Sequence, residues 1–136
     1  MSYILDRLDQ LLADAQAAVD GSTLPDKDSI TVTDDGRKVS TAESLRAGAI
    51  IIYPMPVEEW PAPSTGRLSW TIGVVASSDS ARDAADRIHA LKDLLLDAGV
   101  TRWRDRAAPT DFTLPNQGTV PGYTITHIEE HTRRSS

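Results

Sequence analysis

The stretch that decides the fold class is LSWTIGVVASSDSARDAADRIHALKDLLLDAG, residues 68–99, where a strand pattern passes directly into a helix pattern. Apolar side chains alternate over residues 68–76, which predicts a strand with one buried face. Ser80 and Asp83 have the spacing of a capping box, and Gly99 suits the end of a helix. Between them, an apolar stripe at helical spacing predicts an amphipathic helix. The stripe consists of Ala84, Ile88, Leu91, Leu95 and Ala98.

A second amphipathic helix is predicted near the amino terminus, and short strands follow it. The apolar residues of this helix are Ile4, Leu8, Leu11, Leu12, Ala15 and Val19. ITVT (30–33) alternates like a short strand, and AIIIY (49–53) is a continuous β-rich run typical of a strand covered on both faces. Between them, Ser40 has capping-box spacing to Glu43 and predicts a short helix that ends at Gly48.

The remaining segments are predicted to be loops and extended pieces. PMPVEEWPAPSTG (54–66) holds four of the eight prolines and predicts a surface loop. Residues 101–130 read as extended pieces separated by prolines, and residues 132–136 as a frayed tail. The separating prolines are Pro109, Pro115 and Pro121. We therefore expect residues 1–136 to form a single α+β domain, with a largely antiparallel sheet and two amphipathic helices packed on one face.

Composition narrows the classes of protein. With 136 residues, 40% hydrophobic and 25% charged, the chain has the size and make-up of one globular domain. The net charge of -6 argues against a surface built to hold nucleic acid. The absence of cysteine excludes disulfides and thiolate chemistry, and no apolar run is long enough for a membrane span. No signal-peptide pattern opens the sequence, so we expect a cytosolic protein that does not bind membranes.

HIEEH, residues 127–131, matches the H-x-x-E-H pattern of one class of zinc peptidases through His127, Glu130 and His131. That pattern requires a helix, which brings two imidazoles about 6 Å apart on one face. YTITHIEE instead favours a strand, in which the two histidines would stand about 13 Å apart. We therefore expect no metal site here and interpret the motif as the polar end of a surface strand.

No other segment predicts catalysis. His89 lies between apolar residues of the long helix and is expected at the flank of its packed stripe. Glu58 and Glu59 are adjacent in the proline-rich segment, so they lack the opposed environments that separate an acid from a base. The sequence contains neither a G-x-S-x-G elbow nor a glycine-rich phosphate loop. We therefore predict no catalytic residues, no cofactor and no enzyme activity.

Two segments are candidates for protein contact. If TRWRDR (101–106) forms a strand, Arg102, Arg104 and Arg106 share one side and Trp103 the other. Such arginines bind phosphate or acidic surfaces of neighbouring copies, and the alternative is a solvated strand edge protected by charge.

The second candidate is Trp60 with Glu59 in the proline-rich segment. Prolines on both sides stiffen the segment and lower the entropy lost on docking. The alternative is that Trp60 folds back on its own core. Charge is also uneven: residues 1–99 hold 9 Lys and Arg against 16 Asp and Glu, a net of −7, whereas residues 100–136 hold 5 against 4, a net of +1.

The layout of most of the chain resembles the tail-terminator (tail-completion) proteins of long-tailed bacteriophages, also labelled minor tail or neck proteins. A leading amphipathic helix, DRLDQLLADA, precedes a hydrophobic strand that ends in proline, GAIIIYPMP. LSWTIGVVA then runs directly into the long helix, and PGYTIT supplies a late strand. The resembled family is structural, so it transfers no catalytic residue.

The resemblance implies a virion protein that forms a homo-oligomeric ring, with a hexamer as the expected size. The ring would end growth of the tail tube, dock to the tube protein and to neck or head-completion proteins, and let DNA pass without reading its sequence. Assembly would take place in the host cytoplasm. The alternatives are a head-tail connector subunit, a non-viral α+β binding protein and, least favoured, an HIEEH metallohydrolase.

Overall fold

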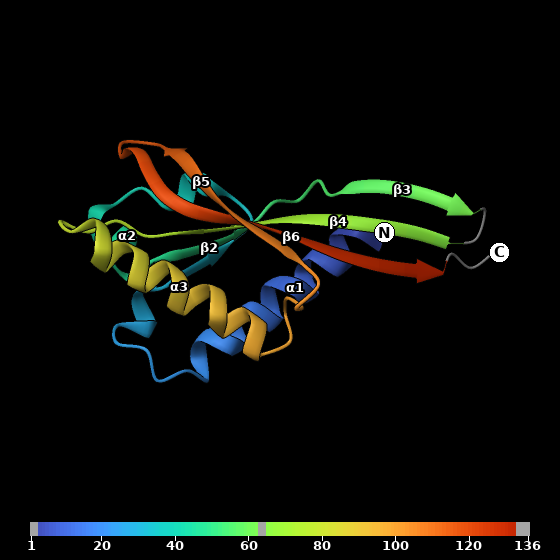
Figure 1. Ribbon diagram of the computed structural model, residues 1–136, viewed down its shortest axis with the longest axis horizontal. Coiled ribbons are helices and arrows are strands. Elements are labelled where there is room, and N and C mark those ends of the chain that lie inside the picture. Colours follow the sequence, from blue (N-terminus) through green and yellow to red (C-terminus); the bar gives the residue numbers. More distant parts are fainter. Residues whose placement is uncertain (1–2, 63–64, 133–136) are drawn as a thin grey trace.

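The computed structural model describes residues 3–62 and 65–132, and within these residues it has the α+β fold that the sequence predicts. A six-stranded, mostly antiparallel sheet carries the helices (Figure 1). The elements are α1 (Tyr3–Asp20), the 3-10 turn η1 (Lys27–Ser29), β1 (Thr31–Thr33), the 3-10 turn η2 (Gly36–Lys38), α2 (Ala42–Ala47), β2 (Ala49–Ile52), β3 (Val57–Ala62), β4 (Thr65–Val75), α3 (Ala81–Asp97), β5 (Arg106–Leu114) and β6 (Gly118–Thr132).

Strand β4 is the centre of the sheet. The strand order is β1-β2-β4-β6-β5, with β3 also paired to β4. β2 pairs with residues 72–75 of β4 and β3 with residues 65–69, so β2 and β3 lie end to end along one edge of β4. β6 follows the other edge along the whole of β4. Only the β1–β2 pair is parallel among the described strands.

The connection from β4 to α3 and the end of α3 confirm the predicted caps. The hydroxyl of Ser80 accepts a hydrogen bond from the Asp83 amide at 3.3 Å. At the other end, the amides of Gly99 and Val100 donate to the carbonyls of Leu96 and Leu95 at 3.1 and 2.9 Å. These two bonds form a Schellman motif, which satisfies carbonyls that the helix leaves open.

Both long helices pack on one face of the sheet, as expected. Leu11 of α1 and Leu91 of α3 meet Ile50, Trp70 and other buried residues in one core. A second core covers the opposite face, where Leu45 of α2 and Phe112 of β5 pack against β2. All four residues of β2 are buried, so the prediction of a strand covered on both faces is confirmed.

The prediction that residues 54–66 form only a surface loop is wrong. Residues 57–62 are β3, and β4 already begins at Thr65. β3 is an edge strand, where proline removes no hydrogen bond that the sheet needs. Pro61 lies at a register irregularity in the β3–β4 pair, while Pro54 and Pro56 occupy the break between β2 and β3.

Four smaller expectations are corrected. Pro109 and Pro121 lie within β5 and β6 instead of separating strands; β5 is an edge strand, and Pro121 is beyond the last β4–β6 pair. The cap of α2 is Thr41, whose hydroxyl accepts from the Ser44 amide, and not Ser40. Residues 101–105 are turns, since TRWRDR forms no strand before Arg106. β6 reaches residue 132, and the rest of the expected tail lies outside the described residues.

A three-stranded arm extends to one side of the molecule, beyond α3 (Figure 1). We define the arm as β3 with the paired residues 65–69 of β4 and 128–132 of β6. The amino-terminal half of α1 lies along one face of the arm (Figure 1). The other face carries no helix among the described residues, so the arm presents sheet surface to its surroundings.

At the opposite end of β4 and β6, the ring of Phe112 packs against two glycines, Gly73 and Gly122. A Cβ at Gly73 would meet Phe112 Cε1 at 3.0 Å, and one at Gly122 would meet the Val74 carbonyl oxygen at 2.5 Å and Phe112 Cε2 at 2.8 Å. The missing side chains let the β5–β6 hairpin fold its ring onto the second face of the sheet.

We expect Gly122→Ala to lower the free energy of unfolding by about 1–3 kcal/mol, because the added methyl overpacks this contact. Gly36→Ala is the matched control, since its Cβ would meet nothing closer than Leu114 Cδ2 at 3.7 Å. Urea unfolding curves would measure both variants. Equal midpoints for Gly122→Ala and the wild type would contradict this account of the Phe112 contact.

Candidate functional site

The HIEEH segment lies in β6, as its strand pattern predicts, but His127 is not on the surface. Its side chain is 1% exposed and shares the helix-facing side of the sheet with Trp70, its cross-strand partner. His131 belongs to the same strand, and its side chain lies outside the described residues. Among the described residues, no group of three or more His, Asp or Glu is placed to hold a metal ion.

The imidazole of His127 is held between two carboxylates. Nδ1 lies 2.6 Å from Asp105 Oδ2, and Nε2 lies 3.2 Å from Glu129 Oε2. The carboxylates therefore occupy opposite edges of the ring and cannot converge on one metal ion. Because both ring nitrogens are engaged, the ring has no free position from which to take a proton from a substrate. His127 is thus placed as a structural cation.

Glu129 joins this pair to two further elements. Trp70 Nε1 of β4 donates to Glu129 Oε1 at 3.0 Å, and Arg7 Nε of α1 lies 2.9 and 3.0 Å from the two carboxylate oxygens. Arg7 Nη2 also bonds and ion-pairs with Glu129. Burial alone would raise the pKa of Glu129, but the hydrogen bonds from His127 and Arg7 outweigh it and lower the pKa from 4.5 to about 2.

The same contacts favour the charged forms of the two cations. Burial opposes protonation of His127, yet its hydrogen bonds to Glu129 and Asp105 raise its pKa above the ordinary 6.5. The pKa of Arg7 is also raised, chiefly by its hydrogen bond to Glu129. With His127 protonated, two cations balance two carboxylates, which limits the cost of burying the group. We call these four residues with Trp70 the buried charge network.

Asp105 uses its other contacts to fix the turn that precedes β5. Its Oδ2 accepts from the Arg102 amide at 2.8 Å, its Oδ1 accepts from the Ile128 amide at 3.3 Å, and its own amide donates to the Arg102 carbonyl at 2.9 Å. Arg104 Nη2 reaches the Ile128 carbonyl at 3.4 Å. The turn is therefore fastened to β6 at the base of the arm, with Trp103 88% exposed.

The predicted contact residues lie on two opposite sides of the arm. Glu59 and Trp60 are on β3, at the outer edge of β4, and Trp60 is 45% exposed. Arg102 and Arg104 lie in the turn on the outer side of β6, and Arg106 begins β5. The structure thus separates the two predicted patches by the width of β4 and β6. The three arginines do not form a strand stripe, because Asp105 folds the chain back.

Residues that sequence reasoning missed include Asp105, Glu129 and Arg7. A partial signal existed, since Ile125, His127 and Glu129 alternate in a strand and a buried Ile125 implies that His127 faces the core. The partners on α1 and in the turn are 122 and 22 residues away along the chain. No local pattern in the sequence marks such pairs.

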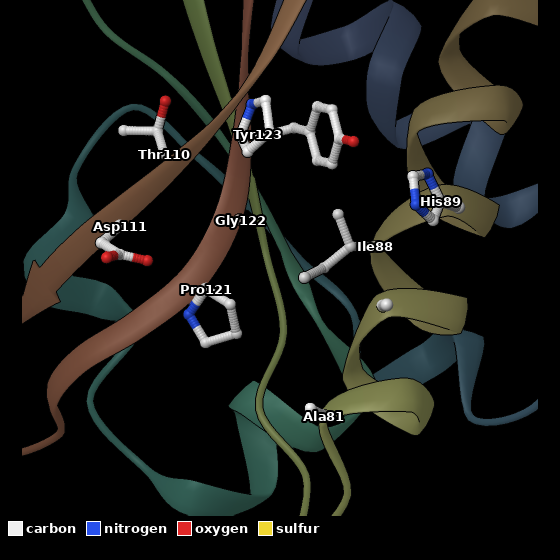
Figure 2. Close-up of a pocket in the computed structure, with 10 residues that line it drawn as sticks. Ala81, Ile88, His89, Thr110, Asp111, Pro121, Gly122 and Tyr123 are labelled. Carbon is white, nitrogen blue, oxygen red and sulfur yellow. The ribbon is translucent and has the colours of Figure 1, made fainter.

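A shallow hollow lies between α3 and the β5–β6 hairpin (Figure 2). Its volume is about 350 Å³, and Ile88, Pro121 and Tyr123 form part of its wall. His89 is exposed and its ring tilts against Tyr123, with 5.2 Å between centroids, while Lys92 Nζ lies 4.6 Å from the Tyr123 ring centre. These are packing contacts at the flank of α3, where the sequence placed His89.

Glu58 and Glu59 do not form an acid–base pair. They are consecutive in β3, so their side chains point to opposite faces of the strand. Glu58 lies opposite Leu68 and Glu59 opposite Arg67.

We expect Glu129→Gln to lower the free energy of unfolding by about 3 kcal/mol, because it leaves His127 and Arg7 without their shared counter-charge. Glu130→Gln is the matched control: Glu130 is the next residue, and its ion pair with Arg67 at 3.3 Å is exposed. The control should change stability by less than about 0.5 kcal/mol. Chemical denaturation would measure both variants. Equal losses would show that the network does not stabilise the fold.

The network also predicts how stability depends on pH. Because the folded pKa of His127 is raised, its contribution is complete below pH 6.5 and is lost as pH rises through the folded pKa. Because that of Glu129 is lowered, its contribution of roughly 3 kcal/mol is present above pH 4.5 and is lost as pH falls towards about 2. The midpoint temperature of thermal unfolding should therefore fall at alkaline pH and at acid pH. His127→Gln should remove the fall at alkaline pH. An unchanged alkaline profile in that variant would contradict the role given to His127.

None of the helices in the described part of the chain has the length and apolar character needed to cross a membrane. Comparison with known proteins found no family model that matches the sequence and no match among curated proteins.

Proposed function

We propose that this chain is a virion structural protein, a tail terminator of a long-tailed bacteriophage that assembles as a ring at the end of the tail tube. The order of elements supports the proposal: a leading helix, a proline-terminated hydrophobic strand, the Trp-bearing β4 that enters α3, and a late strand. This is the layout for which the sequence resembles that family.

The main structural support for the proposal is the arm and its exposed apolar side chains. The arm projects beyond α3 (Figure 1), and exposed apolar side chains lie on it and beside it. Val57 of β3 is 61% exposed, and Met55, two residues before β3, is 84% exposed. Apolar side chains on a projecting sheet are typical of protein contact surfaces. Extended elements of this kind let one subunit reach across to its neighbour in a ring.

The mechanism that we propose is geometric. A ring seated on the last layer of the tube would cover the surface to which further tube subunits add, and its other side would offer a new interface to neck or head-completion proteins. The net charge of -6 disfavours tight binding of phosphates, which suits a ring through which DNA passes. No chemical step is required. The network around His127 serves the shape of the subunit in this proposal.

The test is tail length in a phage that encodes this chain. Deleting its gene should yield tails of uncontrolled length without heads, and adding the purified protein during assembly should restore one length, as measured by negative-stain electron microscopy. Light scattering should give the mass of a ring, expected to be a hexamer, either in solution or on tubes. Normal-length tails that lack only head attachment would point to a connector subunit and overturn the terminator proposal.

A further inference from the structure

We infer that the arm carries both halves of one contact between copies of this chain: the acidic edge of one copy binds the basic turn of the next. The acidic edge is the outer side of β3 with Glu58 and Glu59, one on each face of the strand, and the basic turn is residues 102–105, with the exposed cations Arg102 and Arg104. The inference names the surfaces through which the self-assembly in the proposed function occurs, and it rests on that self-assembly.

The acidic edge is available to a partner. Among the described strands β3 pairs with β4 and with no other, so it is an edge strand of the sheet. Both glutamates are exposed, and neither has an ion-pair partner within residues 3–62 and 65–132. Arg67, which lies opposite Glu59, is already paired with Glu130 at 3.3 Å. The edge therefore keeps a negative charge that its own subunit does not balance.

The basic turn is available in the same way. Its one acidic residue, Asp105, is turned inward, and its Oδ2 pairs with His127 Nδ1 at 2.6 Å. Arg102 and Arg104 remain on the outside with Trp103, and only Arg104 makes a side-chain hydrogen bond within the described chain, to a carbonyl. The turn is thus a cationic surface with an exposed aromatic ring, the composition that favours protein contact. Its backbone is held in place by the bonds to Asp105.

The two surfaces cannot meet within one subunit. Across the base of the arm, β3 lies next to β4, β4 next to β6, and β6 next to the turn. Asp105 of the turn accepts a hydrogen bond from the Ile128 amide of β6. With about 4.8 Å between neighbouring strands, the acidic edge and the basic turn are roughly 14 Å apart and face away from each other. A second copy placed alongside brings its turn to the first copy's edge. Such a contact joins two different patches, so it is heterologous and repeats around a ring.

Charge reversal tests the pairing. We expect Glu58→Arg/Glu59→Arg and Arg102→Glu/Arg104→Glu each to weaken self-association at least roughly tenfold, since like charges would then oppose each other. Mixed together, the two variants restore complementary charge at both contacts, because each contact joins a positive surface of one variant to a negative surface of the other, so they should assemble again as alternating copies in a 1:1 ratio. The quadruple variant in one chain should assemble again. Sedimentation velocity at low and high ionic strength would measure each species, and circular dichroism would verify folding.

Controls carry the same changes of charge elsewhere. Asp86→Arg/Asp97→Arg and Arg46→Glu/Arg82→Glu alter exposed residues of α3 and α2, and they should leave self-association unchanged. A wild-type protein that stays monomeric at millimolar concentration overturns this inference, while tail length still decides the proposed function. Assembly that is indifferent to both reversals, or equally sensitive to the controls, overturns the pairing of these surfaces and leaves the ring proposal standing.

Discussion

The carboxylate of Glu129 is the point at which parts of the chain far apart in sequence are fixed to one another. It accepts hydrogen bonds from Arg7 of α1 and Trp70 of β4, and through His127 it is linked to Asp105. Each link would be weak alone in water, but in a buried site the loss of one partner leaves the remaining charges without compensation. The base of the arm, the first turns of α1 and the turn before β5 therefore hold their positions together.

This constraint gives the surface its charge pattern. Because His127 takes up the charge of Asp105 inside the protein, the turn that contains Arg102 and Arg104 shows only positive charge outside. On the far side, β3 continues the line of β2 along β4 after the interruption at Pro54 and Pro56. The prolines keep the two strands as separate elements, so β2 is buried in the body while β3 belongs to the arm.

Periodicity in the sequence was sufficient to predict the elements whose own residues form a buried face. It failed for elements whose structure depends on their position in the sheet. The cap at Ser80, the Schellman end at Gly99 and the buried β2 follow from local spacing and are confirmed. Proline in residues 54–66 suggested a loop because no local signal shows that β3 is an edge strand. The site was only partly predictable: the contact residues were named, but the burial of His127 depends on partners in other elements.

Rigidity of the turn relative to the arm decides what a heterologous contact can build. Copies joined through two different patches form a closed ring only if every copy turns by the same angle, and otherwise they form open chains of variable length. An arginine loop on a free linker would satisfy the charges at many angles. Here Asp105 bonds the turn to the strand that carries Glu129, so the angle between the basic turn and the acidic edge is set within the subunit. In this proposal the buried charge network fixes the angle of the contact between copies, in addition to stabilising the subunit.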